Sequence, residues 1–370
     1  MKDKPTIVFL LESISQPRCI KRVNSFITNG FNVEIYGIDR GVYTENNFIS
    51  GVKVNVFDKQ RDGKDHIKKL FKNYKSIKKI LKKHDNGKTV FYSFGYAITI
   101  TVLLSGCKKF IYEISDILYG YKKYNFLRPF FKLVDKLMIN KSLLTVLTSE
   151  GFADFFYKKE VPENIIIQPN KLSPYFLKKQ RPTSNGTFCS KKIKFAYVGA
   201  FRFPNTIFRF ANIIGEYFPE HEFHFYGDSA LTNQVISISN KYDNVKYHGS
   251  FKNPDDLSMI YKSLDILVTC YDAQDLNVRI AEPNKLYESL FFNKPIIVSK
   301  ETFLSKKVEM LSCGYSIDAL NDESIKTFVR NIKEENIIKI KDNISRIPNN
   351  EIVDDNSNNI ISYLSKKLDS

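Results

Sequence analysis

Short runs of apolar, mostly β-branched residues alternate with amphipathic stretches along the whole chain. The first half carries the runs TIVFLL, VEIYGI, VKVNVF, TVFYSF, KFIYEIS and LLTVLTS, with helical periodicity at about 18–29 and at 64–83. Nearly continuous apolar runs of this length are typical of strands covered on both faces, and helices between them are the crossovers that parallel neighbours require. The pattern predicts an α/β fold with parallel sheets.

The chain of 370 residues is too long for one ordinary core and fits two domains. Periodicity is lost in the Pro-, Gly- and Ser-containing stretch at 172–191, and a second strand–helix series follows it. We expect a first domain over 1–171, a linker over 172–191 and a second domain over 192–340. A terminal segment over 341–370 contains the helical pattern IISYLSKKL.

The stretch AEPNKLYESLFFNKPIIVS at 281–299 predicts a helix followed at once by a buried strand. Pro283 suits a first helical position, because its fixed φ is already helical and its missing N–H has no partner to lose. Asn293 and Pro295 end the helix before the run IIV. The helix is therefore about ten residues long.

Lys285 and Glu288 lie three residues apart on one face of this predicted helix, near its positive N-terminus. There the backbone N–H groups and Lys285 would neutralise a diphosphate, and Glu288 would accept hydrogen bonds from ribose hydroxyls. The alternative is a solvated helix ion pair, which contributes only about 0.2–0.5 kcal/mol.

The motif PNKLYE with its short helix and KPIIVS strand resembles the donor-site segment of group 1 (family 4) glycosyltransferases of the GT-B fold. Further resemblance lies in KFAYVGAF, HEFHFYGD, NVKYHGSF and DILVTCY of the second half and in VLTSEGFADFF and IIIQPN of the first. The resemblance implies two Rossmann-like domains whose parallel sheets face a central cleft, a last helix that crosses back to the first domain, and transfer without a catalytic metal or other cofactor.

The same resemblance implies further donor-binding residues. Gly199 ends a strand where the family's phosphate loop falls, and Arg202 would clamp phosphate; the alternative is a tight turn with a solvated arginine. Asn284 belongs to the donor motif itself. Asp272 and Asn277 lie in the loop that contacts the sugar or diphosphate in the family, although loop position alone makes them ordinary turn formers.

One position departs from the family pattern. The family carries two glutamates eight positions apart, and eight positions before Glu288 the chain has Ile280, while Glu282 is only six positions away. The role of the missing carboxylate at the sugar ring falls to Asp272 or is not performed. The family implies retention of anomeric configuration, whereas inversion needs a base in the first domain.

Asp116 is the candidate for such a base, because it follows the strand KFIYEIS and would lie at the carboxyl end of the sheet. Its alternative role is a helix N-cap, and Glu113 within the strand is interpreted as structural. The five histidines have no metal-ligand spacing, and the five scattered cysteines indicate neither disulfides nor zinc, so we expect no metal.

The net charge of +16 belongs to the first half, where residues 1–185 carry 33 Lys and Arg against 16 Asp and Glu, while residues 186–370 carry 23 against 24. This asymmetry favours an anionic partner such as a phospholipid surface. The segment 64–83 combines an apolar stripe with nine lysines, and YGYKKYNFLRPFFK at 119–132 is aromatic and basic. No apolar run is long enough to cross a membrane and no signal peptide is evident.

These observations predict a cytoplasmic glycosyltransferase, peripheral on the inner face of the cell membrane. It would move a sugar from a nucleotide-diphosphate donor to a lipid-linked glycan in capsule or O-antigen synthesis. The alternatives are a non-catalytic GT-B scaffold, a nucleic-acid- or membrane-binding protein, and a nucleotide-sugar epimerase. Nucleic acid is the weaker partner, because no recognisable motif accompanies the lysines.

Overall fold

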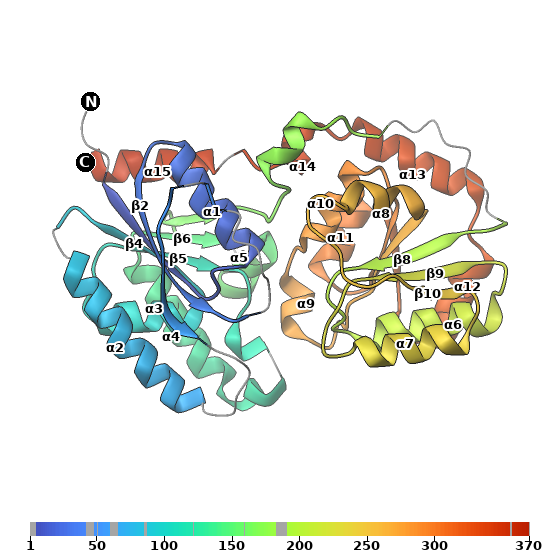
Figure 1. Cartoon of the computed structure of the whole chain (residues 1–370), viewed down its shortest axis with the longest axis horizontal. Helices are drawn as coiled ribbons and strands as arrows, with labels where there is room; N and C mark the ends of the chain where they lie inside the picture. The colour runs from blue at the N-terminus through green and yellow to red at the C-terminus, as the bar shows by residue number, and fades with distance from the viewer. Residues whose placement is uncertain are drawn as a thin grey trace. The chain divides into compact units, whose positions relative to one another are not determined.

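The structure is a computed structural model that describes residues 5–41, 48–49, 51–59, 66–84, 87–120, 122–158, 160–182, 191–355 and 357–369. The chain divides into two compact units. The first is Met1–Ser173 together with Asp355–Ser370, and the second is Pro174–Asp354. Each unit is built on one parallel sheet covered by helices (Figure 1), which confirms the predicted α/β class.

The first unit has a seven-stranded sheet in the order β3-β2-β1-β4-β5-β6-β7. The central strands β1, β4 and β5 are almost wholly buried because their sequences are almost continuously apolar. The strand order reverses between β1 and β4, so the adjoining loops diverge at the carboxyl edge, where ligands of such sheets bind. The strands are β1 Thr6–Leu11, β2 Asn32–Asp39, β3 Val54–Lys59, β4 Val90–Phe94, β5 Phe110–Ile114, β6 Leu144–Leu147 and β7 Ile165–Ile167.

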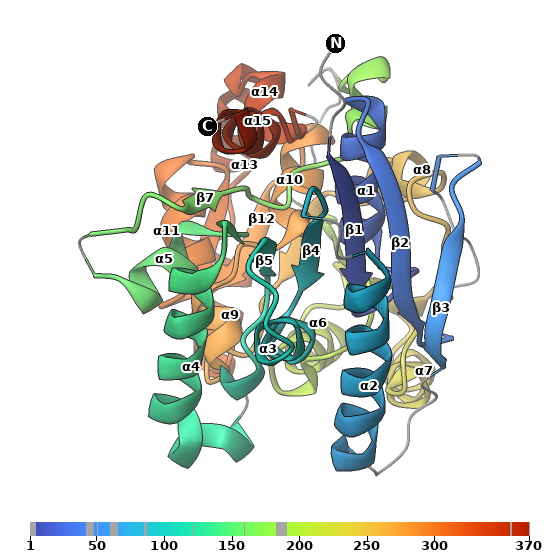
Figure 2. The ribbon, with the colours of Figure 1, turned by 90° about the vertical axis from the view of Figure 1, so that its left-hand side faces the viewer.

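Two layers of helices cover this sheet. Helices α1 and α15 pack on one face, in a core that includes Phe9, Phe26 and Leu364. Helices α2, α3 and α4 lie side by side on the other face (Figure 2). The helices of the unit are α1 Pro17–Thr28, α2 His66–His84, α3 Tyr96–Leu104, α4 Arg128–Lys141, α5 Glu150–Phe156 and α15 Asn358–Asp369, with 3₁₀ turns η1 Leu118–Gly120 and η2 Lys122–Leu127.

The lysine-rich helix expected at 64–83 is α2. Ile77 and Leu81 of its predicted apolar stripe are buried, and so is Ile80 beside them. The side chains of Ile67, Leu70 and Phe71 lie outside the described part of the chain. No described helix combines the length and the apolar character that crossing a bilayer requires.

The second unit has a six-stranded parallel sheet in the order β10-β9-β8-β11-β12-β13, with the order reversing between β8 and β11. Its phenylalanine-rich core includes Phe195, Phe210, Phe223 and Phe225. The strands are β8 Lys194–Val198, β9 Glu222–Tyr226, β10 Val245–Tyr247, β11 Ile266–Thr269, β12 Ile296–Ser299 and β13 Gly314–Ile317. The helices are α6 Arg209–Tyr217, α7 Thr232–Lys241, α8 Leu257–Ser263, α9 Leu276–Ile280, α10 Asn284–Phe291, α11 Phe303–Met310, α12 Asp322–Arg330, α13 Glu334–Arg346 and α14 Asn349–Ile352, with a π turn η4 Pro204–Phe208 and a 3₁₀ turn η3 Pro174–Lys178.

Candidate functional site

Helix α10 forms where the PNKLYE motif predicts it. Pro283 is the N-cap residue, with φ −75° and ψ 150°, one position earlier than expected, and the first helical residue is Asn284. After the helix, Asn293 adopts a left-handed conformation with φ 52°. Asparagine tolerates this conformation better than most residues, which explains why the helix stops before β12.

The Lys285–Glu288 pair is buried. Nζ of Lys285 lies 2.5 Å from Oε2 of Glu288, and the two side chains are only 8% and 1% exposed. The alternative of a solvated surface ion pair is therefore wrong for this chain. Burying two charges is costly unless each is well satisfied, so the pair needs further hydrogen bonds.

Two neighbours supply hydrogen bonds to Glu288. The Tyr261 hydroxyl donates to Oε2 over 2.6 Å, and Nδ2 of Asn284 donates to Oε1 over 3.0 Å. A carboxylate accepts about four hydrogen bonds, and Tyr261, Asn284 and Lys285 already donate three to Glu288. A ribose that brings two hydroxyl donors would thus have to displace Asn284 or Lys285 from one of these bonds.

The glycine at the end of β8 lies over Lys285. Gly199 has φ 137°, and a Cβ built on it would come 3.6 Å from Cε of Lys285. Gly227, at the end of β9, is packed still more tightly, because a Cβ there would lie 2.0 Å from the carbonyl oxygen of Gly199. Only glycines allow these strand ends to approach so closely. The carboxyl edge of the sheet therefore presents backbone directly beside a lysine.

Arg202 and Glu288 both act electrostatically on Tyr271. The guanidinium of Arg202 is exposed, and its charge opposes the rise that burial causes in the pKa of Tyr271. Glu288 acts on Tyr271 in the opposite direction and raises that pKa. The Tyr271 ring stacks on Phe203, with centroids 4.6 Å apart. An exposed arginine near a buried Lys–Glu pair can bind an anion, as a phosphate loop requires.

Asp272 and Asn277 have local structural roles. Oδ1 of Asp272 accepts from the N–H of Gln274 over 3.0 Å, which is an Asx turn. Asn277 is buried in α9, and its N–H donates to the capping carboxylate of Asp275 over 2.8 Å. These contacts match the turn-forming alternative, and a ligand role for either residue stays a prediction.

Glu282, two positions after Ile280, is held by side chains of its own unit. Its side chain is buried, accepts a hydrogen bond from the Tyr287 hydroxyl and lies 4.0 Å from Nζ of Lys307. Ile280 itself ends α9.

In the first unit, Asp116 follows β5 at the carboxyl edge and is exposed. Sequence reasoning missed its neighbour Glu12, which directly follows β1. Burial raises the pKa of Glu12, Arg40 and Arg18 lower it, and the charge of Asp116 raises it further. A Cβ on Gly95 would lie 2.0 Å from Oε1 of Glu12, so Gly95 makes room for that carboxylate. The sequence did carry a signal for Glu12, because this acid directly follows the first apolar run, TIVFLL.

Glu113 has the structural role expected of it. Its carboxylate is buried and lies 3.0 Å from Nε of Arg22 and 3.4 Å from Nε of Arg18. The Tyr92 hydroxyl donates to it over 2.5 Å. These contacts connect β5 to α1 and leave Glu113 inside the core.

Among the described residues, no group of three or more His, Cys, Asp and Glu side chains is placed to hold a metal ion. His224 does contact two such side chains: its Nδ1 lies 2.9 Å from Nε2 of His248 and its Nε2 lies 3.0 Å from Oε2 of Glu222. The expectation of a metal-free site stays a prediction.

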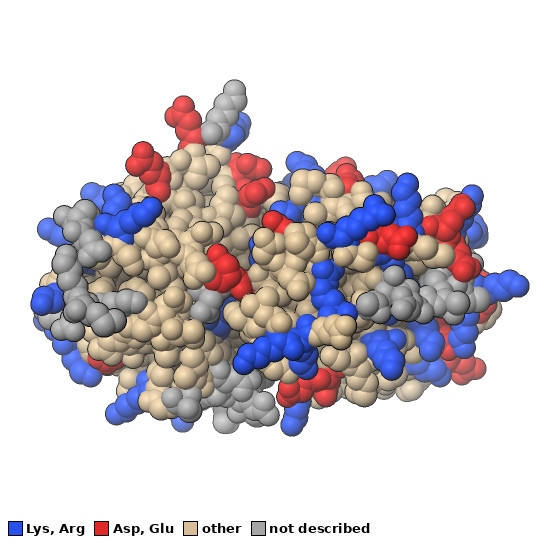
Figure 3. Space-filling model, turned by 90° about the horizontal axis from the view of Figure 1, so that it is seen from above, with Lys and Arg blue, Asp and Glu red and all other residues tan. Residues whose placement is uncertain are grey.

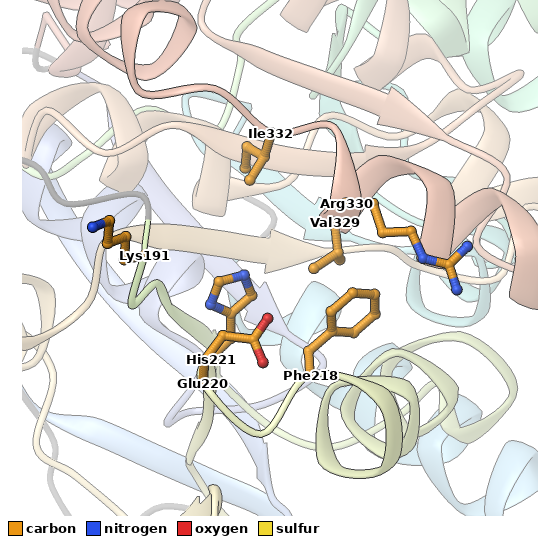
Figure 4. A pocket seen from close by; sticks show the side chains of 7 residues that line it. All are labelled: Lys191, Phe218, Glu220, His221, Val329, Arg330 and Ile332. Carbon is orange, nitrogen blue, oxygen red and sulfur yellow. The ribbon is translucent and has the colours of Figure 1, made fainter.

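A hollow of about 440 Å³ opens at the other end of the second sheet (Figure 4). Glu220 and His221 precede β9, while Val329 and Arg330 end α12. The hollow therefore lies at the amino edge of the sheet, away from Gly199, and is not part of the candidate site. Its lining residues are Lys191, Phe218, Glu220, His221, Val329, Arg330 and Ile332.

No family model and no curated protein matches the sequence. Solved structures do share its fold. A glycosyltransferase from Rickettsia africae ESF-5 matches with a TM-score of 0.67 at 13% identity, over 98% of each chain. HepE of Anabaena, solved in complex with UDP and glucose, matches with a TM-score of 0.67 at 13% identity, over 98% of this chain and 99% of that one. WaaG, a glycosyltransferase involved in lipopolysaccharide biosynthesis, matches with a TM-score of 0.63 at 14% identity, over 98% of each chain. The chain therefore has the fold of these glycosyltransferases, the two-domain α/β fold called GT-B.

Proposed function

We propose that the chain is a glycosyltransferase that takes a sugar from a nucleotide-diphosphate donor. The observation that carries this proposal is the buried Lys285–Glu288 pair at the start of α10, lying under the glycine that ends β8. Burying an ion pair is costly, and a helix of this length gains little from it, so a ligand role accounts for the pair better than stability does.

In this proposal the donor lies at the carboxyl edge of the second sheet. Lys285, Arg202 and the backbone beside Gly199 receive the diphosphate. Glu288 and Asn284 receive the ribose, with Asn284 giving up its bond to Oε1 as the hydroxyls arrive. Asp272 and Asn277 meet the sugar. HepE, which has the same fold and was solved with UDP and glucose, supports a nucleotide sugar as the donor class.

The reaction is accelerated because the site stabilises the negative charge of the leaving diphosphate. The bond from the sugar C1 to the diphosphate oxygen breaks, and that oxygen gains negative charge beside Lys285 and Arg202. The acceptor hydroxyl oxygen bonds to C1 and passes its proton to the departing diphosphate, so no enzyme nucleophile is needed and configuration is retained. One preorganised donor of this kind is worth about 2.7–4 kcal/mol in other enzymes. No metal enters this scheme.

We propose Asp116, with Glu12 beside it, as the acceptor-orienting group of the first unit. The acceptor is a lipid-linked glycan of a surface polysaccharide, and the protein works at the inner face of the cell membrane. The basic first half supports an anionic membrane as partner. The description of WaaG as a lipopolysaccharide enzyme supports a surface glycan as product.

The test is turnover of radiolabelled nucleotide sugars, screened donor by donor with membrane extract as acceptor. We expect one donor to label a lipid-extractable product, and the double variant K285M/E288Q, which lacks both charges of the pair and should melt near the parent, to abolish the labelling. If the protein binds nucleotide but no donor gives a product, the enzyme proposal fails. A non-catalytic scaffold then follows, which the isoleucine at position 280 favours.

A further inference from the structure

Helix α4 and the turn before it present a row of large apolar side chains outward. Phe126 is 95% exposed, Phe130 61%, Leu133 67% and Leu137 48%. Phe130, Leu133 and Leu137 are spaced by three and four residues, so they lie on one face of the helix. Single exposed apolar residues need no explanation, but a contiguous row indicates a contact surface.

The opposite face of α4 fixes the orientation of the helix. Met138 and Ile139 are fully buried, and Asp135 is buried between two tyrosines. Its Oδ1 accepts from the Tyr112 hydroxyl and its Oδ2 from the Tyr119 hydroxyl, each over 2.6 Å. Because these contacts hold the inner face, the apolar row on the outer face cannot turn inward to join the core.

Cations border the row on its own helix. Nζ of Lys132 lies 4.0 Å from the centre of the Phe155 ring, and Nζ of Lys136 lies 5.0 Å from that of Tyr157. Both ammonium groups thus lie over rings of residues 155–157, and Lys136 directly precedes Leu137 of the row. Lys141, in the last turn, is exposed.

The neighbouring helices extend this surface. Leu104, at the end of α3, is 67% exposed, and α3 lies between α4 and α2 (Figure 2). Six lysines of α2 are exposed, namely Lys72, Lys75, Lys78, Lys79, Lys82 and Lys83. On the side that carries α15, the coloured part of Figure 3 shows Lys and Arg interspersed with Asp and Glu instead. The layer of α2, α3 and α4 therefore combines an apolar row with charge of one sign.

We propose that this layer is a docking face for an anionic lipid bilayer, in which Phe126, Phe130, Leu133 and Leu137 enter the boundary between headgroups and acyl chains. An apolar row bordered by lysines is the pattern of helices that lie in that interface. Lysines near an anionic surface strengthen the binding electrostatically. A second copy of the chain is a poorer occupant, because it would bring the same positive face. The inference rests on the membrane partner proposed above and names the surface that binds it, but it does not depend on the reaction that the second unit performs.

The test is sedimentation of the full chain with vesicles at low salt, using either phosphatidylcholine alone or phosphatidylcholine with phosphatidylglycerol. The apolar variant is F130S/L133S/L137S. Its control is M259S/M310S, which removes two side chains of the second unit that are each 68% exposed. The charge variant is K75Q/K78Q/K79Q/K82Q. Thermal melts verify that each variant folds, and nucleotide affinity is measured for each.

We expect the parent and the control to bind the anionic vesicles and to release at high salt. The apolar variant should bind at least about tenfold more weakly with unchanged nucleotide affinity, since three large side chains no longer leave water. The charge variant should lose its preference for anionic lipid. Equal binding by parent and apolar variant, or equal binding to both vesicle types, would overturn the proposal. A parent dimer that the apolar variant dissociates would assign the face to self-association instead.

Discussion

The hydroxyl of Tyr261 donates to Oε2 of Glu288 over 2.6 Å, and both side chains are buried, although 27 residues separate them in sequence. Burial raises the pKa of Tyr261, and the charge of Glu288 raises it further. The tyrosine thus remains a neutral donor. It shares Oε2 with Nζ of Lys285, so two donors from different segments hold one carboxylate oxygen in place.

Tyr261→Phe should weaken nucleotide binding about fivefold, because it removes one hydrogen bond of about 1 kcal/mol from Glu288. The ring stack between Tyr261 and Phe292, with centroids 4.5 Å apart, is available to phenylalanine as well. Calorimetric affinity measures the effect. Tyr242→Phe, which removes a hydroxyl 3.4 Å from Glu216 at an exposed position, is the control and should bind as the parent does. Parent-like affinity in Tyr261→Phe would show that Glu288 is positioned without it.

Lys285→Met should destabilise the second unit by about 3–5 kcal/mol, because it leaves the buried Glu288 charge without its cation. Glu288→Gln keeps the shape but loses the charged acceptor, and should lose roughly 1.5–3 kcal/mol of nucleotide binding. The double variant K285M/E288Q removes both charges and should melt near the parent. It should neither bind nucleotide nor transfer sugar. A folded double variant with parental binding and turnover would reduce the pair to a structural salt bridge.

Asp116→Asn should lower transfer strongly and leave nucleotide affinity nearly unchanged, because the proposed donor site lies in the other unit. The pH dependence of transfer distinguishes the roles of Asp116 and Glu12. Since Asp116 raises the pKa of Glu12, removing its charge lowers that pKa. If the ionised Glu12 orients the acceptor hydroxyl, the acidic limb of the pH–rate profile should move to lower pH in Asp116→Asn and vanish in Glu12→Gln. Normal turnover in both variants would leave the carboxyl edge of the first sheet without a role in transfer.

Asp135→Asn should change how stability depends on pH. Burial raises the pKa of Asp135 from 3.8 to about 6, against the lowering effect of its two tyrosine hydrogen bonds. The folded state therefore favours the protonated acid, and its stabilising contribution is present below pH 4 and lost as pH rises through 6. Between pH 4 and 7 the free energy of unfolding of the parent should fall by about 2–3 kcal/mol more than that of the variant. Urea titrations measure this difference.

The exposed Asp154 of α5 gives the matched control, and Asp154→Asn should follow the parent curve. Equal pH dependence in all three proteins would mean that Asp135 is ionised in the folded core.

Local pattern was enough to predict the two parallel sheets and, to within one residue of its start, the helix of the PNKLYE motif, because buried strands and a proline-opened helix are encoded within a few residues. It was not enough for the environment of that helix. Whether Lys285 and Glu288 are solvated or buried depends on Tyr261 and Gly199, which come from other segments. The outward row on α4 was predicted only in part: the aromatic and basic segment 119–132 includes Phe126 and Phe130, but a periodic apolar stripe indicates a face and not what covers it, so Leu133 and Leu137 were missed.

Helix α15 follows the whole second unit in the chain yet fills the core of the first with Ile360 and Leu364. During synthesis, residues 174–354 emerge as one continuous piece and can fold while the first sheet still lacks this helix. Until α15 is made, the core cluster that contains Phe9 and Phe26 lacks the side chains of this helix. The first unit is therefore the last to be completed, and a nascent chain that stalls before residue 358 would present an open hydrophobic face to chaperones.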